Sequence, residues 1–284
     1  MSGLENTEPV LSVVGTDTTY PHWVVLHVPH DSTDVPSSVR GQFLLNDIEL
    51  ATELDCMTDH QTLALFSDTG SVGQVVRAPV SRLVVDVERF AQDDDEPMAS
   101  RGMGAIYTVT SHLNPLRRPL TAEERNALMR NYYIPHHQRL ESAVASAIDL
   151  YDRCLVVDCH SFPDRPLPYE LADPDSLRPD ICIGVDDFHT SEELLNAFVT
   201  EFRRAGWTVS VNDPFSGALV PGSRYQRDHR VNAIMVEVNR RLYLHEASAD
   251  PLPDFTLVTQ QVKRCCMAAI DSFTREERAT GKIE

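Results

Sequence analysis

The sequence predicts an α/β fold in which a mostly parallel central sheet is flanked by helices. Two observations support this fold class: several short runs rich in β-branched residues are apolar throughout, and helical patterns lie between them. Continuous apolar runs are typical of central strands that are covered on both faces. Strands that alternate with helices favour a mostly parallel sheet. A chain of 284 residues is long enough to bury a sizeable core.

The predicted elements follow one another along the chain. The strand-like runs are WVVLHV (23–28), LVVDV (83–87), CLVVDC (154–159), ICIGV (181–185), WTVSV (207–211) and NAIMVEV (232–238). The helical patterns span about residues 46–66, 121–151, 190–205 and 254–277. Thr121 and Glu124 have the spacing of a capping box at the start of the second helix. Pro135 is expected to kink or split that helix.

Two stretches lack these patterns and are interpreted as long loops. Residues 91–120 contain DDDE, two glycines and NPLRRP, and residues 162–180 are rich in proline and aspartate. Regular patterns resume after each stretch, so we expect one domain over residues 1–284. Long loops within a compact domain are more often functional than idle. We therefore expect both loops to lie near the functional site.

The charge and cysteine content exclude several classes of protein. With 25 basic and 43 acidic residues, the formal charge is −18, which repels nucleic acid and anionic membranes. No apolar run approaches the ~20 residues of a membrane span. None of the six cysteines forms a CxxC pair, and no signal peptide is visible in MSGLENTEPVLSVV. We expect a reduced, cytoplasmic protein that binds a small molecule.

Polar residues at the ends of three predicted strands indicate a metal site. WVVLHV leads into His30, CLVVDC leads into His160, and NAIMVEV contains Glu237. In α/β sheets, ligands bind beyond the carboxyl ends of the strands. Neutral imidazole is a preferred zinc ligand, and a catalytic zinc typically has three protein ligands. The pattern therefore predicts one divalent ion, zinc, held by His30, His160 and a third residue.

Nearby carboxylates are candidates for the remaining roles. Asp59, in the helical pattern after the His30 loop, could be the third ligand, and Asp158 could orient a ligand histidine. Glu237 could be the general base that deprotonates the attacking water. The alternative interpretation of a strand-end histidine is a hydrogen-bonded structural residue. For Glu237 and Asp158 a role is favoured, because a buried carboxylate is costly unless it is paired or functional.

Seven motifs in order resemble the N-formylglutamate amidohydrolase family from about residue 22 to residue 243. They are PHDSTDVP (29–36), TDHQTLALF (58–66), SRLVVDVERF (81–90), YYIPHHQRL (132–140), VDCHSF (157–162), NDPFSGALV (212–220) and VEVNRRLY (236–243). The resemblance implies a three-layer sandwich like that of zinc carboxypeptidases. It also implies His30, Asp59 and His160 as zinc ligands and Glu237 as the base. Carboxypeptidases place the acidic ligand three residues after the first histidine, where this chain has Thr33, whereas related amidases take it from the following helix, as Asp59 would be.

The resemblance also suggests residues that handle the substrate. SRxxxD matches Arg82 and Asp86, with Asp86 expected to support a ligand. His137 matches the histidine of PYH and could donate a hydrogen bond to the oxyanion. The candidates for substrate binding are Arg82, Arg89, Arg224 and Asn212, because an arginine fork suits a carboxylate. The alternative for Arg82 and Arg89 is a structural ion pair with Asp86 or Glu88.

Two departures from the family pattern concern the substrate. Members that act in histidine breakdown commonly have asparagine where this chain has Glu88, and glycine where it has Ala218. An additional carboxylate near a substrate carboxylate is unfavourable, so the substrate can differ from formylglutamate. The sequence thus predicts zinc-dependent hydrolysis of an N-formyl or N-acyl amino acid, with N-formyl-L-glutamate as the named candidate. The alternatives are a zinc peptidase, carboxypeptidase or amidase acting on a short peptide, and a metal-free binding protein that retains the fold.

Overall fold

The centre of the molecule is a six-stranded sheet with the order β2-β1-β3-β6-β4-β5. The computed structural model describes residues 20–67 and 74–281. Strands β2, β1, β3 and β6 run parallel, whereas β4 pairs antiparallel with β6 and parallel with β5. The prediction of an α/β fold with a mostly parallel sheet is confirmed. The strands are β1 (Val24–Val28), β2 (Gln74–Arg77), β3 (Cys154–Phe162), β4 (Ile181–Gly184), β5 (Val209–Val211) and β6 (Val231–Asn239).

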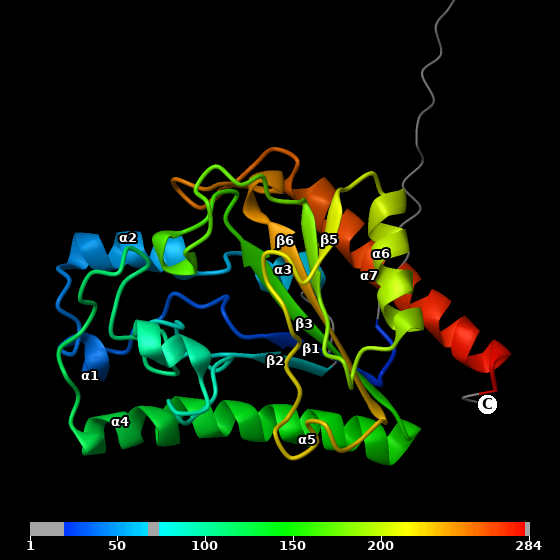
Figure 1. Cartoon of the computed structure of the whole chain (residues 1–284), viewed down its shortest axis with the longest axis horizontal. Helices are drawn as coiled ribbons and strands as arrows, with labels where there is room; N and C mark the ends of the chain where they lie inside the picture. The colour runs from blue at the N-terminus through cyan, green and yellow to red at the C-terminus, as the bar shows by residue number, and fades with distance from the viewer. Residues whose placement is uncertain (1–19, 68–73, 282–284) are drawn as a thin grey trace, which may run out of the picture.

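Helices cover both faces of the sheet (Figure 1). Helix α5 (Ile134–Tyr151) packs on one face, where Val25 and Val156 join its apolar side. Leu26 and Val157 point to the other face, because successive strand residues alternate, and they join the core under the helices there. Burial on both faces explains why these strands are continuously apolar. The helices of the second face are α3 (Thr62–Phe66), α6 (Glu192–Arg204) and α7 (Phe255–Ala279).

A separate hydrophobic cluster lies beside the sheet, to the left in Figure 1. It includes Val39, Leu50, Leu116 and Leu128, all of which are buried. Its regular elements are α1 (Ser37–Arg40), α2 (Asp47–Met57), the 3₁₀ helix η1 (Pro97–Arg101) and α4 (Ala122–Leu128). The remaining elements are the 3₁₀ helices η3 (Pro168–Glu170) and η4 (Arg240–Leu242) and the two-residue strands β7 (Leu244–His245) and β8 (Asp250–Pro251).

The run LVVDV (83–87) was predicted as a strand, and this prediction is wrong. The segment is buried but consists of turns and irregular backbone. Its carbonyl groups find partners other than a neighbouring strand: the Arg117 guanidinium donates hydrogen bonds to the carbonyls of Leu83 and Val84. The Asp86 amide donates to the Ala105 carbonyl at 2.8 Å. A side chain and a loop thus satisfy the backbone polar groups of this buried apolar run.

Two predicted helices depart from regular α-helix in the structure. The helix expected over 46–66 is divided into α2 and α3, with Asp59 in the break. The helix expected over 121–151 begins at the predicted capping box of Thr121 and Glu124. Its middle is a π-helical turn, η2 (Met129–Tyr133), and Pro135 lies in the first turn of α5. The backbone stays helical through η2 into α5, so the π-helical turn before Pro135 accommodates its missing N–H group without ending the helix.

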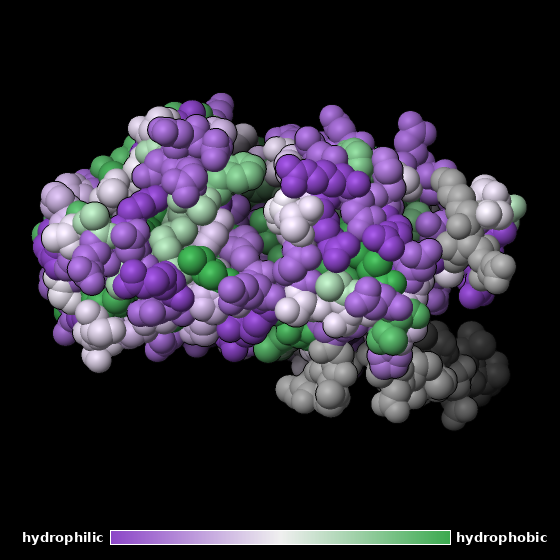
Figure 2. Space-filling model, turned by 90° about the horizontal axis from the view of Figure 1, so that it is seen from below, coloured by the Kyte–Doolittle hydropathy of each residue, from purple (hydrophilic) through white to green (hydrophobic). Residues whose placement is uncertain are grey.

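The outer side of the α5 layer is polar. Figure 2 views the molecule from this side, and hydrophilic residues cover most of the face, with hydrophobic residues in small groups among them. This agrees with the burial of Leu140, Val144 and Ile148 on the inner side of α5. None of the helices in the described part of the chain has the length and apolar character needed to cross a membrane.

Candidate active site

Three predicted ligand residues meet at the carboxyl ends of β1 and β3. His30 follows β1, His160 lies within β3, and Asp59 lies in the break between α2 and α3. The Asp59 amide donates a hydrogen bond to the His30 carbonyl at 2.9 Å, which fixes the break against the strand end. All three residues are buried, with exposed fractions of 2%, 2% and 4% for His30, Asp59 and His160.

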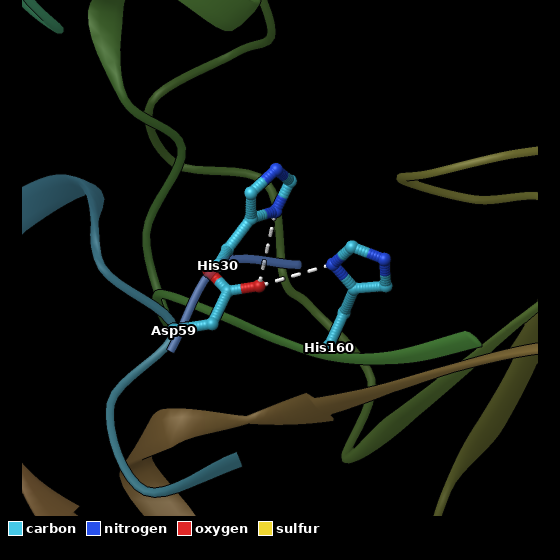
Figure 3. Close-up of side chains that lie close together, drawn as sticks. All are labelled: His30, Asp59 and His160. Carbon is cyan, nitrogen blue, oxygen red and sulfur yellow. Dashed lines mark hydrogen bonds and ion pairs between the residues drawn. The ribbon is translucent and has the colours of Figure 1, made fainter. Parts of the chain in front are cut away.

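The ligand atoms of these residues point toward one another (Figure 3). Oδ2 of Asp59 lies 3.1 Å from Nδ1 of His160 and 3.6 Å from Nδ1 of His30. One ligand atom from each residue lies within 4.8 Å of the other two. His30 Nδ1 is buried and has no hydrogen-bond partner among the residues that the structure describes. A buried polar atom without a partner is costly, so the donor set fits a bound divalent cation.

Hydrogen bonds hold each of these side chains in this orientation. Nε2 of His30 lies 2.8 Å from Oδ1 of Asp86, and Nε2 of His160 lies 3.0 Å from Oδ1 of Asp158. Each outer ring nitrogen can therefore donate to a carboxylate, which leaves the lone pair of Nδ1 directed toward Asp59. Pairs of this kind fix the tautomer and orientation of metal-binding histidines. The second oxygen of Asp59, Oδ1, accepts a hydrogen bond from Arg240 at 3.0 Å.

The acidic groups around the two histidines are held in the charged form. Burial raises the pKa of the Asp59 carboxyl, but the neighbouring imidazoles of His160 and His30, together with the Arg240 charge, bring it well below its usual range. Burial also raises the pKa of the Asp86 carboxyl, but His30 and the Arg82 guanidinium, 3.1 Å away, bring it well below its usual range. The site is therefore rich in carboxylate charge where a cation would bind.

Glu237 lies beside His160 on the neighbouring strand. The two residues are directly paired in the register between β3 and β6, so their side chains leave the sheet on the same face. Oε2 of Glu237 is buried and without a hydrogen-bond partner among the described residues. Burial raises the pKa of this carboxyl to about 8, and the nearby Asp59 adds to the effect, although His160 opposes it. Glu237 is thus a carboxyl group that can hold or release a proton near neutral pH.

These residues line a cavity of about 480 Å³, a size common for small-molecule sites. Both long loops contribute to its wall. Met98 and Arg101 come from the loop over 91–120, and Leu167, Tyr169 and other residues come from the loop over 162–180. A third segment, over residues 213–216, completes the wall.

Four arginines line the cavity, and they differ in how their charge is balanced. Arg82 forms an ion pair with Asp86 at 3.1 Å, which is the structural alternative that the sequence suggested for this residue. Arg240 forms an ion pair with Asp59. Arg89 lies 3.6 Å from Asp86. Arg101 is exposed and forms no ion pair with a carboxylate in the described part of the chain. It is the cavity arginine most free to bind an anionic group.

A buried histidine pair behind His160 was not predicted from the sequence. Nδ1 of His27 lies 2.8 Å from Asp158 and 3.1 Å from Oε1 of Glu88, and its Nε2 lies 2.8 Å from Nε2 of His136. Burial lowers the pKa of His27, but the carboxylates of Asp158 and Glu88 raise it to about 9. Burial and the charge of His27 lower the pKa of His136 to about 2.

His27 is therefore an imidazolium. Its Nδ1 donates to Asp158 and forms an ion pair with Glu88, and its Nε2 donates to neutral His136. The ligand atoms of His27, Glu88 and Asp158 lie within 4.8 Å of one another, but a protonated His27 occupies this position itself and offsets part of the negative charge of the two carboxylates. This cation also offsets the unfavourable carboxylate that Glu88 adds to the cavity wall.

Three predicted site residues are not brought to the cavity wall. His137 donates from Nε2 to the Val87 carbonyl at 3.0 Å. Asn212 accepts a hydrogen bond from the Val185 amide, and Arg224 pairs with Glu141 and Asp228. Each of these contacts is structural, and none of the three residues lines the cavity. In contrast, Arg240 and Arg101 line it but were not predicted. Arg240 directly follows β6, the strand that carries Glu237, and this position at a strand end is the sequence signal that could have identified it.

Comparisons with known proteins agree with this architecture. The family model described as N-formylglutamate amidohydrolase matches residues 23–244. An N-formylglutamate amidohydrolase structure from Ralstonia eutropha JMP134 superposes with a TM-score of 0.77 at 21% identity, covering 89% of this chain and 95% of the other. A gene product from Agrobacterium tumefaciens superposes with a TM-score of 0.65 at 20% identity, covering 90% and 92%. At these identities the structures show a shared fold. No curated protein sequence matches the chain.

Proposed function

Because the chain belongs to the N-formylglutamate amidohydrolase family, we propose that it hydrolyses the amide bond of an N-formyl or N-acyl amino acid, with N-formyl-L-glutamate as the first candidate. The observation that carries this proposal is the convergence of His30, Asp59 and His160 beside Glu237 in one cavity. Amide hydrolysis needs an activated water, a polarised carbonyl and a proton for the leaving amine. The cavity contains groups suited to each of these tasks.

We propose that His30, Asp59 and His160 hold one zinc ion. Two imidazoles and one carboxylate are the donor types that a catalytic zinc uses. Bound there, zinc would lower the pKa of a water molecule to about 7 and polarise the carbonyl of the substrate. Asp86 and Asp158 would keep the two rings in position, and Arg240 would keep Oδ2 of Asp59 directed at the same point.

The second proposed role belongs to Glu237. Its Oε2 atom, which is free of protein partners among the described residues, would accept a proton from the attacking water. The same carboxyl would then deliver that proton to the nitrogen of the leaving amine. The proton acceptor and the proton donor are thus one group, and a pKa raised by burial suits it to both steps. Donors for the developing oxyanion would come from the cavity arginines, since His137 is engaged with Val87.

The substrate's carboxylate would bind at Arg101. This guanidinium reaches the cavity from η1 without an ion-pair partner in the described part of the chain, whereas Arg82 and Arg240 are held by Asp86 and Asp59. A planar guanidinium binds a carboxylate through two hydrogen bonds.

We also propose that the protein is cytoplasmic, as the sequence predicts.

Release of formate tests the proposed function. The purified protein, supplied with zinc, would be incubated with N-formyl-L-glutamate, N-acetyl-L-glutamate and short peptides, and formate, acetate and free amines would be measured. We expect release of formate or acetate that depends on Glu237. Turnover of peptides alone would favour a peptidase, and absence of turnover on every substrate despite bound zinc would contradict the proposal.

A further inference from the structure

A second cavity, of about 380 Å³, lies on the other side of η1 from the active site. The two cavities share this short helix as a wall. Met98 and Arg101 line the active-site cavity, whereas Ala99 and Gly102 line the second one. The remaining wall comes from the segment that leads into α4 and from the first residues of that helix, including Arg117 and Ala122.

Arg117, in the wall of this cavity, is a buried cation that forms no ion pair with a carboxylate of the described residues. Its side chain is 5% exposed and stacks over the Phe43 ring, with 4.9 Å between the guanidinium carbon and the ring centroid. Its hydrogen-bond partners are the neutral oxygens of Leu83, Val84 and Gln42, and its Nε atom has none among the described residues. Burial lowers the pKa of Arg117 to about 10, and no carboxylate opposes that effect. An unpaired buried charge is costly.

The other charged residues of the cavity are already balanced. Arg118 pairs with Glu124, and Arg125 pairs with Asp93 at 2.9 Å. The unbalanced charge in the cavity wall is therefore the positive charge of Arg117. This is notable in a chain with a formal charge of −18, in which most unpaired charges are expected to be negative.

We propose that the second cavity binds a small anion that carries a carboxylate or phosphate group. The anion would supply the counter-charge that Arg117 lacks. Arg118 and Arg125 lie at the same wall, where Glu124 and the cavity residue Asp93 already balance their charges. The site is distinct from the active site because η1 separates the two cavities. This inference does not depend on the proposed hydrolysis.

Calorimetric titration of the zinc-loaded protein tests the site, with inorganic phosphate and succinate as probes and sodium chloride at equal ionic strength as the blank. Saturable binding of phosphate or succinate is expected for the unaltered chain, and the stronger of the two identifies the preferred anionic group. Absence of saturable binding for both probes would overturn the proposal.

Substitutions distinguish this cavity from the active site. Removing Arg117 can unfold the chain, because this side chain holds the buried 83–84 segment. Ala122→Glu instead places a carboxylate at the cavity wall, in an exposed position of α4. We expect it to raise the Kd of the anion about tenfold or more, because it supplies the counter-charge and repels the probe. Asn126→Glu, exposed on the same helix but outside the cavity, is the matched control.

The two controls should leave the anion affinity unchanged: Asn126→Glu, and Arg101→Gln in the active-site cavity. If Ala122→Glu binds phosphate and succinate as tightly as the unaltered chain, or if Arg101→Gln removes the binding, the anion occupies another place and the proposal is wrong.

Discussion

The carboxylate of Asp158 lies 3.0 Å from Nε2 of His160, on the far side of the ring from Nδ1. The hydrogen bond directs Nδ1 of His160 toward Asp59, 3.1 Å away. A pair of residues only two positions apart on β3 thus determines which nitrogen faces the proposed metal. Asp86 has the same relationship to His30, although it comes from a different segment.

The first prediction concerns this orientation. Asp158→Asn should weaken zinc binding about 10- to 100-fold, because the amide no longer fixes the tautomer and orientation of the ring. A competition titration with a chromophoric chelator measures the zinc Kd. Asp86→Asn should weaken binding to a similar degree through His30. An unchanged zinc Kd in both variants, with the fold intact by circular dichroism, would show that the two carboxylates do not support metal ligands.

Glu237→Gln tests the proposed base. The amide retains the shape of the side chain but cannot accept a proton, so kcat should fall by about 10²- to 10⁴-fold while zinc content stays unchanged. Formate release in the steady state gives kcat, and metal analysis of the same sample gives zinc content. Glu123→Gln, exposed on α4, is the control. A Glu237→Gln variant with unaltered kcat would remove this residue from the mechanism.

Arg101→Gln tests recognition of the substrate carboxylate. A charged hydrogen bond contributes about 1.5–3 kcal/mol, so KM should rise roughly 10- to 100-fold. The value of kcat should change little if the contact is equally strong in the ground state and the transition state. Initial rates over a range of substrate concentrations separate the two constants. Arg130→Gln, exposed and outside both cavities, is the matched control, and an equal KM for both variants would contradict the role of Arg101.

His27 should make folding stability depend on pH. Its pKa is raised from 6.5 to about 9 in the folded state, because the carboxylates of Asp158 and Glu88 outweigh burial. The groups that face it are Asp158 from β3, Glu88 from the preceding loop and neutral His136 from α5. A group with a raised pKa stabilises the fold fully below its unfolded pKa, and this stabilisation is lost as the pH rises through the folded value.

The measurement is the free energy of unfolding in urea for the unaltered chain and for His27→Gln. The difference between them should be largest near pH 6 and should shrink between about 6.5 and 9. A difference that stays constant over this range would show that His27 is not an imidazolium in the folded protein.

Much of the fold and part of the candidate site can be predicted from the sequence because their signals are local. Each central strand is a continuous apolar run; His30 lies two residues after one of them, and His160 lies near the end of another. LVVDV has the same local pattern, yet it is not a strand, because the side chain of Arg117, 34 residues away from Leu83, satisfies its backbone. Such a long-range contact leaves no trace in the run itself.

The residues that were missed depend on tertiary contacts for the same reason. His27 is one of several residues in an apolar strand, and only its partners 131 and 109 positions away, Asp158 and His136, make it a charged group. Arg101 lies in a loop without periodicity, so its place at the cavity depends on η1 and the chain around it. His137 is the converse case: it was predicted from a family motif, but its side chain donates to the Val87 carbonyl and does not line the cavity.

The metal content of the purified protein tests the central proposal most directly. Elemental analysis after dialysis should find about one zinc ion per chain in the unaltered protein and a large loss in His160→Ala, because a catalytic zinc needs its three protein ligands. The His160→Ala variant should also lose formate release. A full complement of zinc in that variant, or an active unaltered protein without stoichiometric metal, would contradict the assignment of His30, Asp59 and His160 as a zinc site.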